Sequence, residues 1–253
     1  MKNKIIVCLI FLILNLNLVV AQTSPKIQVG IDEKLGSYIP LDTKFVTSEN
    51  DTITMAELIT KPTLISLVYY QCPGICSPLL TELGWVANKI DLKPVKDFQV
   101  VSLSFDHHEN SQIAKKWKEN YLKGIKGKFP PNAWIFLTGD SINIKKFTDA
   151  VGFYFKPDKK EFVHAGTVLT LSPKGKISRY IYGTEFNPFE MKMALLEAES
   201  GKSSPTSAKI LQFCFSYDPK GRSYTLNLTR IIGSVMLLTV GIFLVFLIKK
   251  KKK

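Results

Sequence analysis

The chain is poor in the residues that most often carry metal or thiol chemistry. Its 253 residues include only four cysteines and three histidines. It contains no internal repeat, which excludes architectures built by stacking copies of one unit. Acidic residues are also scarce, 21 against 34 basic ones, and the formal net charge is +13. The few cysteines and histidines therefore narrow the search for a functional site to a handful of positions.

The positive charge does not indicate a nucleic-acid-binding protein. Seven basic residues lie at the two extreme ends of the chain, which leaves a formal charge of +6 for the remainder. The other lysines, such as Lys115, Lys116 and Lys118, are scattered as they are on solvated helix and loop faces. A nucleic-acid site needs a basic patch interleaved with aromatic residues in an intracellular protein. The export signal described next argues against that class.

The N-terminus has the pattern of a secretory signal peptide over residues 1–21. Lys2 and Lys4 precede an apolar run from Ile5 to Val20, and the small residue Ala21 follows. A short basic region, a short apolar core and a small residue at the exit are typical of an exported protein. We predict cleavage after Ala21. The alternative is an uncleaved anchor.

A second apolar stretch predicts a transmembrane helix over residues 230–248. Ile231–Ile248 is uncharged, and at about 1.5 Å per residue it nearly crosses a hydrocarbon core of about 30 Å. Lys249–Lys253 follow as a basic tail, and lysine-rich flanks stay on the cytoplasmic side. We therefore expect a single-pass protein of the inner (plasma) membrane. Its soluble domain faces the periplasmic or outer side, and its C-terminus, residues 249–253, is cytoplasmic.

Residues 26–204 form the predicted folded domain, and residues 205–229 a linker to the membrane. Strand-like and helix-like patterns alternate along the domain, which is typical of an α/β fold. We expect a mostly parallel central sheet with a late antiparallel hairpin. The expected elements are, in order, a hairpin of 44–46 and 52–54, strand 63–70, helix 78–90, strand 98–105, helix 110–121, strand 133–137, helix 141–151, a hairpin of 168–171 and 177–182, and helix 187–199.

Cys72 and Cys76 are the sharpest chemical feature. They lie between a buried strand and a helix for which Ser77 is the expected N-cap and Pro78 the first residue. In open α/β sheets, sites are built at this carboxyl end of a strand. The helix dipole and free backbone N–H groups favour the thiolate, which is both nucleophile and metal ligand.

The spacing of the two cysteines leaves their role open. Pro73 and Gly74 shape a tight loop, so the sulfurs can approach closely enough to bond or to share a metal ion. Three residues separate them, whereas a thioredoxin-type oxidoreductase has two. The remaining alternative is an inert structural disulfide, as exported proteins often have.

His164 is the candidate third ligand. Two thiolates and an imidazole suit a soft ion such as Cu(I) and remain competent for Cu(II), whereas structural zinc normally needs a fourth ligand. The alternative is a loop histidine bonded to backbone.

His107 and His108, beside Asp106, would share the sheet edge with the cysteines, either as solvated histidines or as a secondary metal or docking site. The role of Cys214 remains open: it is a free thiol, a further metal ligand late in the chain, or one half of an intermolecular disulfide.

The segment Tyr69–Pro78, which holds both cysteines, resembles the SCO/SenC family of copper chaperones. Val29–Gly36, Val101–Asp106 and Val163–Gly166 resemble further family segments, so the resemblance covers residues 29–199. Tyr217–Pro219, followed by a membrane helix, resembles the family's bacterial branch. The chain departs from the usual family pattern at three positions, which are Ser77, His107 and Val163.

The resemblance implies a thioredoxin-like fold and a copper site made by Cys72, Cys76 and His164, with Asp106 in a supporting role. It also implies that the chain delivers copper to, or reduces the thiols of, the binuclear copper centre of a respiratory cytochrome c oxidase. The implied partners are the copper-bearing oxidase subunit, thiol reductases and copper carriers.

Three hypotheses remain for the function of the chain. The first is a copper-binding assembly factor. The second is an enzyme, a thiol–disulfide oxidoreductase of the cell envelope, in which Cys72 and Cys76 form a redox-active disulfide and His164 is dispensable. The third is an interaction module with a passive disulfide. His164 and the three-residue spacing favour copper, and the thioredoxin-like layout keeps redox chemistry open.

Overall fold

The computed structural model describes residues 29–203 except 128 and 160, together with 215–218, 223–226 and isolated positions between 233 and 241. The predicted signal peptide, the basic tail and Cys214 lie outside the described residues, as does the predicted membrane helix apart from those isolated positions. In the described part of the chain, no helix is both long enough and apolar enough to cross a membrane.

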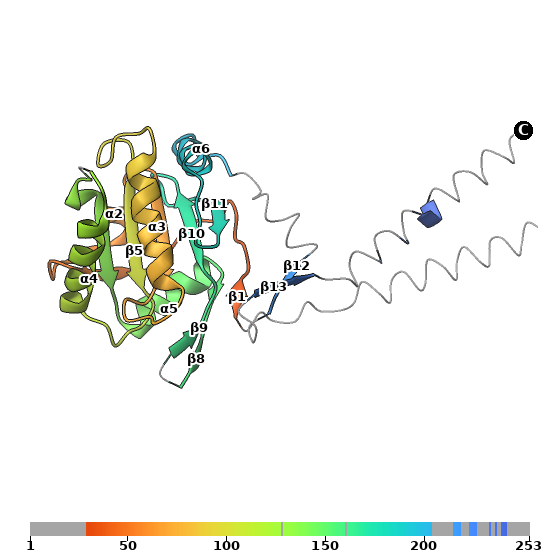
Figure 1. The fold of residues 1–253 in the computed structure, drawn as a ribbon, viewed down its shortest axis with the longest axis horizontal. Helices are drawn as coiled ribbons and strands as arrows, with labels where there is room; N and C mark the ends of the chain where they lie inside the picture. Colours follow the sequence, from red (N-terminus) through yellow and green to blue (C-terminus); the bar gives the residue numbers. More distant parts are fainter. Residues whose placement is uncertain are drawn as a thin grey trace, which may run out of the picture.

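The elements of the domain alternate much as the sequence pattern predicts, with additional short strands. Figure 1 carries the labels used from here on. In chain order the elements are β1 (Gly30–Ile31), β2 (Lys44–Thr47), β3 (Thr52–Thr54), α2 (Met55–Leu58), β4 (Thr63–Val68), α3 (Cys76–Lys89), β5 (Gln99–Ser104), α4 (Ser111–Gly124), the 3-10 turn η1 (Pro131–Ala133), β6 (Trp134–Thr138), α5 (Ser141–Ala150), β7 (Phe153–Tyr154), β8 (Lys156–Asp158), β9 (Glu161–Val163), β10 (Thr167–Leu171), β11 (Ile177–Tyr182), α6 (Pro188–Glu199), β12 (Phe215–Asp218) and β13 (Ser223–Leu226).

The main sheet has the strand order β11-β10-β4-β5-β6-β2-β3. Its three central strands β4, β5 and β6 are parallel, and the four other pairings described in it are antiparallel. The prediction of a mostly parallel sheet is therefore wrong, and the sheet is mixed. The reason is that both hairpins join the sheet at its edges and bring antiparallel pairings with them. Local periodicity identifies a hairpin but not the strand on which it docks.

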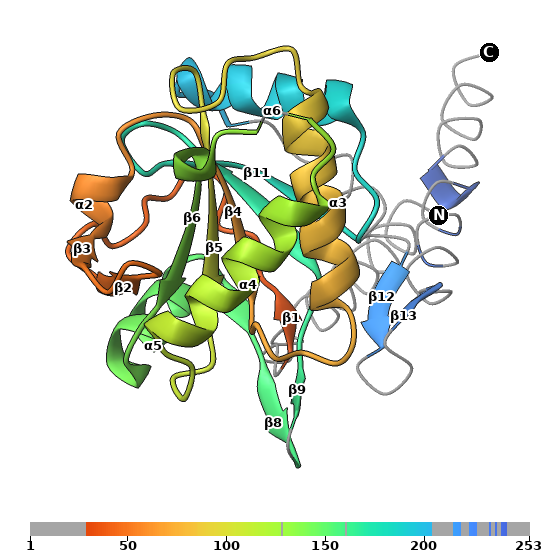
Figure 2. The same cartoon turned by 60° about the vertical axis from the view of Figure 1, so that its left-hand side comes forward.

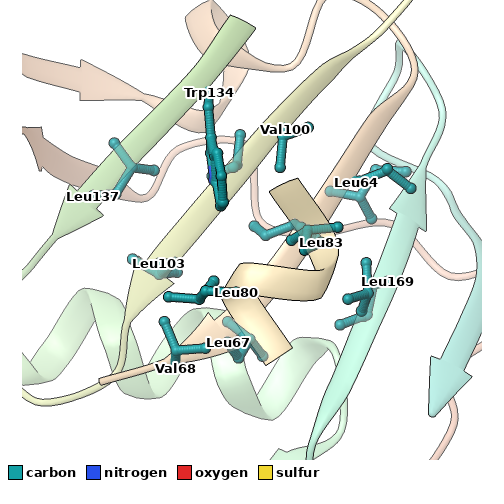
Figure 3. Packing of buried hydrophobic residues seen from close by; sticks show 14 of the residues in the cluster. Leu64, Leu67, Val68, Leu80, Leu83, Val100, Leu103, Trp134, Leu137 and Leu169 are labelled. Atoms are coloured by element: carbon teal, nitrogen blue, oxygen red, sulfur yellow. The ribbon is translucent and has the colours of Figure 1, made fainter. Parts of the chain in front are cut away.

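Helices α3, α4 and α6 lie together on one face of this sheet (Figure 2). All residues of β4 and β5 are buried, as expected for strands that are covered on both faces. Leu80 and Leu83 of α3 point at the strands, where Leu67, Leu103 and Trp134 lie close by (Figure 3). Burying one such leucine contributes about 1.5–3 kcal/mol, so this contact holds α3 firmly on the sheet.

The start of α3 differs from the prediction in a way that matters for the site. The helix begins at Cys76 and not at Pro78, and its N-cap is Ile75, whose side chain makes no capping hydrogen bond. Ser77 lies inside the first turn, so its prediction as the N-cap is wrong. The first backbone N–H groups of a helix have no partner within the helix, and the Cys76 N–H is one of these and acts on the Cys72 thiol.

The other long helices begin within one residue of their predicted starts, and each has a polar N-cap. Asn110, Asp140 and Asn187 each accept hydrogen bonds from backbone N–H groups in the first turn of α4, α5 and α6. Such caps supply an acceptor that the helix itself lacks. The turn residues that precede each helix are thereby fixed, and the turn before α4 contributes to the sites described below.

Several short strands were not predicted. β1 pairs with β7, and β8 pairs with β9 in a narrow hairpin that extends beyond the body of the domain (Figure 1). The β8–β9 hairpin ends directly before His164, so it leads the chain into the site. Strands β12 and β13 pair with each other inside the range predicted as linker.

Candidate metal centre

Sheet register brings Cys72, Cys76 and His164 together. β10 runs antiparallel to β4, and Val168 of β10 lies opposite Ser66 of β4. The start of β10 therefore lies beside the end of β4. Cys72 follows β4, Cys76 opens α3, and His164 precedes β10. Cys76 and His164 are 88 positions apart in the sequence, and one strand pairing brings them together.

The ligand atoms of the three side chains lie within 4.8 Å of one another. The Cys76 Sγ is 3.5 Å from the His164 Nε2, and neither described cysteine is in a disulfide. Metal–sulfur and metal–nitrogen bonds are about 2.0–2.3 Å long, so two ligands of one ion lie at most about 4.6 Å apart. Small side-chain rotations are therefore enough to place all three atoms around one ion. Two thiolates and an imidazole form a donor set that fits soft copper.

His164 is oriented by the backbone and by aromatic rings. Its Nδ1 lies 3.0 Å from the Ala165 carbonyl oxygen, which can only accept, so Nδ1 carries the proton. In the neutral ring Nε2 is then unprotonated and presents its lone pair toward Cys76, as in metal-ligating histidines whose other nitrogen is held by a carbonyl. The ring is buried, with the rings of Tyr69 and Phe105 centred 5.8 and 5.0 Å away.

The pKa values of the two thiols are shifted in opposite directions. A hydrogen bond from Cys76 lowers the pKa of Cys72 to about 3, although partial burial opposes that shift. Burial, followed by the interaction with Cys72, raises the pKa of Cys76 well above its ordinary value. The Gly74 N–H also donates to the Cys72 Sγ over 3.3 Å. Cys72 is therefore the thiolate of the pair, and Cys76 keeps its proton as the donor.

A cavity of about 400 Å³ opens at Cys72 and His164. Tyr69 and Phe162 form part of its wall, and the burial of Tyr69, together with a hydrogen bond involving Cys72, raises the pKa of the tyrosine hydroxyl. At Gly166 an added Cβ would lie 2.9 Å from the Ile75 Cδ1. The glycine therefore lets the histidine segment approach the cysteine loop closely.

Glu109 anchors the start of the cysteine loop, and the sequence interpretation did not identify it. This buried carboxylate accepts hydrogen bonds from the backbone N–H groups of Tyr70 and Gln71, at 2.8 and 2.7 Å, and from the Ser104 hydroxyl at 2.6 Å. Burial raises its pKa, and these hydrogen bonds oppose the rise. The three donors come from the ends of β4 and β5, so Glu109 fixes the loop to the sheet. The one signal available in the sequence was an acidic residue shortly after a buried strand.

Asp106, His107 and His108 form a second group at the same sheet edge. Their ligand atoms also lie within 4.8 Å of one another, and both histidines are exposed. Since β4 and β5 are parallel, the prediction that these residues share the edge of the cysteines is confirmed. Asp106 accepts a hydrogen bond from the His108 N–H. Among the described contacts, Glu109 and not Asp106 accepts the hydrogen bonds that hold the start of the cysteine loop.

Comparison with known proteins assigns the family. A sequence profile described as SCO1/SenC matches residues 37–198, which is more than half of the chain. The chain belongs to the SCO1/SenC family. This SCO1/SenC domain has the thioredoxin-like α/β fold that the sequence resemblance predicts. No curated protein is similar enough in sequence to count as a match.

Solved structures share the SCO1/SenC fold. A candidate electron transfer protein from Aquifex aeolicus VF5 is 32% identical, covers 66% of this chain and 95% of its own, and has a TM-score of 0.60. ScoI of Arabidopsis thaliana with copper bound is 18% identical over 61% of this chain and 94% of its own, with a TM-score of 0.51. BsSco is a member of the Sco family of cytochrome c oxidase assembly proteins and is described for its disulfide switch. It is 19% identical, covers 67% of this chain and 96% of its own, and has a TM-score of 0.53.

Proposed function

We propose that this chain is a membrane-anchored copper-binding chaperone that delivers copper to the binuclear copper centre of a respiratory cytochrome c oxidase, or reduces the thiols of that centre. One observation carries the proposal: the His164 Nε2 faces the Cys76 Sγ at 3.5 Å, beside Cys72. A dithiol needs no imidazole for redox chemistry, but a soft metal ion gains a third ligand from it. The copper-bound ScoI of Arabidopsis thaliana has the same fold and supports this choice.

The cavity is suited to holding a cargo ion temporarily. Cys76 and His164 are buried, whereas Cys72 is partly exposed and lines the opening. A partner's thiolates reach Cys72 first, which allows an ion to pass from one set of sulfur ligands to another. We infer that the partner surface is the copper-bearing subunit of the oxidase, and that thiol reductases or copper carriers use the same opening.

The test is Cu(I) stoichiometry of the purified full chain under anaerobic conditions, measured by competition with a chromogenic Cu(I) chelator. We expect one Cu(I) bound with high affinity in the wild-type chain and an affinity lower by about 10-fold to 100-fold in His164→Ala. Thr184→Val is the matched control, because it alters the wall of the same cavity without removing a nitrogen or sulfur ligand. Equal Cu(I) affinity of His164→Ala and the wild type would overturn the three-ligand site.

The second candidate is a thiol–disulfide oxidoreductase of the cell envelope. The lowered pKa of Cys72 favours it, because a partly exposed thiolate beside a buried thiol is the arrangement of an attacking and a resolving cysteine. The disulfide switch described for BsSco is consistent with this reading. In that case His164→Ala would retain disulfide-reducing activity in an assay with a disulfide-bonded substrate, and Cys72→Ser would abolish it.

The location belongs to the same proposal. The signal-peptide pattern of residues 1–21 and the apolar run before Lys249–Lys253 support an inner-membrane protein whose domain faces the periplasmic or outer side. The test is protease treatment of intact spheroplasts. We expect the domain to be degraded without permeabilisation, and protection of the domain would contradict this topology.

A further inference from the structure

A tight turn after β5 presents two imidazoles and a carboxylate on the protein surface. The Glu109 N–H donates to the Asp106 carbonyl oxygen over 3.1 Å, which closes the turn, and the His108 N–H donates to the Asp106 Oδ1 over 3.0 Å. His107 and His108 are the two central residues of this turn, and both are exposed. Their rings lie side by side, with centroids 4.0 Å apart and an angle of 39° between the planes.

The turn is held in place from beneath. Glu109, its last residue, is buried and accepts three hydrogen bonds from the ends of β4 and β5, whereas Asn110 caps helix α4 immediately afterwards. The backbone of the three surface donors is therefore fixed at both ends. A preorganised group loses less conformational freedom when it binds an ion than a flexible one does.

The donor set selects a different ion from the cysteine centre. One carboxylate and two imidazoles are oxygen and nitrogen ligands, which suit borderline divalent cations and among these bind Cu²⁺ most strongly. The three ligand atoms lie within 4.8 Å of one another. Both histidine side chains are exposed and Asp106 is half-buried. The His108 N–H donates to the Asp106 Oδ1 and not to its Oδ2, so the carboxylate keeps a second oxygen for an ion.

Aromatic rings separate the two groups of ligands. His107 and Phe105 border a second cavity, of about 330 Å³. Phe162 lines both this cavity and the one at Cys72. The Phe105 ring contacts the rings of both His164 and Phe155, with centroids 5.0 and 4.5 Å away. The surface group is therefore a neighbour of the cysteine centre but shares no ligand with it.

We propose that Asp106, His107 and His108 form a second metal site, which binds one divalent cation of the Cu²⁺ type at the surface of the domain. The site goes beyond the proposed copper-chaperone function and stands on its own residues. It holds its ion through nitrogen and oxygen donors that remain open to solvent.

The test uses the full chain carrying Cys72→Ser and Cys76→Ser, so that failure of the thiol centre does not affect the result. Cu²⁺ is titrated against this protein by calorimetry, and the bound ion is examined by electron paramagnetic resonance. We expect one Cu²⁺ with two nitrogen ligands. Adding His107→Gln and His108→Gln should weaken binding by at least about tenfold and remove the nitrogen hyperfine pattern.

Two further variants make the outcome decisive. Asp106→Asn keeps an acceptor for the His108 N–H but removes the charge, and we expect it to weaken Cu²⁺ binding by about tenfold. Glu119→Gln, an exposed residue of α4, is the matched control and should leave binding unchanged. Equal Cu²⁺ affinity with and without the two histidines would overturn the proposal, and so would an unaltered affinity in Asp106→Asn.

Discussion

The buried group of Cys72, Cys76 and His164 and the exposed group of Asp106, His107 and His108 lie at one edge of the same sheet, yet they are built in opposite ways. Three separate segments assemble the buried group, and strand pairing brings them together. The exposed group consists of successive residues of one turn. Sulfur and nitrogen ligands in a buried setting favour a soft ion, whereas oxygen and nitrogen ligands at the surface favour a divalent one.

The two sites depend on the fold in different ways. A site made from distant segments depends on the whole sheet, so it is lost when the domain unfolds. A site made within one turn depends on the hydrogen bonds that close the turn and on Glu109, which fixes the turn to the sheet. Variants that change metal binding at one group but not at the other therefore test whether the two sites are independent.

The largest effect is expected at Cys76. Cys76→Ser replaces a buried sulfur by a harder hydroxyl oxygen, and we expect the Cu(I) affinity to fall by more than about 100-fold. His107→Gln is the comparison from the exposed group and should leave the Cu(I) affinity unchanged. Competition with a Cu(I) chelator under anaerobic conditions measures both. A comparable loss in the two variants would contradict the separation of the groups.

The next effect is expected at Glu109, which contributes to both regions. Glu109→Ala leaves two backbone N–H groups and one hydroxyl without their acceptor, and we expect the free energy of unfolding to fall by about 3 kcal/mol. Urea denaturation measures it. Glu109→Gln keeps one acceptor oxygen and should lose less. If Glu109→Ala unfolded at the wild-type urea concentration, Glu109 would not be the anchor of the loop.

A smaller effect is expected at the helix cap beside the exposed group. Asn110→Ala removes the acceptor for the Ile113 N–H and should lower the free energy of unfolding by about 1 kcal/mol. Asn187→Ala at α6 is a matched cap far along the chain and should lower it by a similar amount. We expect only Asn110→Ala to weaken Cu²⁺ binding at the turn. Equal Cu²⁺ affinities would show that the turn needs no support from α4.

The smallest effect is expected for pH: the rate at which Cys72 is alkylated should hardly change with pH. Because the pKa of Cys72 is lowered to about 3, its thiolate is already formed at pH 5 and stays formed to pH 8. The rate of Cys72 alkylation should then change by less than about twofold across this range, whereas an ordinary cysteine with a pKa near 8.5 gains roughly tenfold per pH unit. Mass spectrometry of the alkylated Cys72 peptide follows the rate. A tenfold rise per unit would mean that Cys72 is an ordinary thiol.

Much of the fold was predictable because local patterns specify it. The buried strands β4 and β5, the starts of α4 and α6 and the late hairpin all agree with their predicted positions to within two residues. The α/β class and the thioredoxin-like layout are confirmed. The mostly parallel sheet and the Ser77 cap were wrong, because the docking of hairpins and the first turn of α3 depend on long-range packing.

The candidate site was predictable in part. Cys72, Cys76 and His164 stood out as reactive residue types, and the structure brings all three together. Glu109 did not stand out, because an acidic residue after a strand is usually solvated. Its role becomes visible only from its burial and from the donors that surround it.

By itself the sequence determined the alternation of strands and helices, the thiol pair at the end of a strand, and the chemical nature of the donors. These features depend on residue type and short-range spacing. Tertiary structure showed how His164, 88 residues after Cys76, reaches the Cys76 thiol, and it alone decided that Glu109 is buried and anchors the cysteine loop. The physical reason is that contacts between distant segments depend on strand register and packing, which no local pattern of residues specifies.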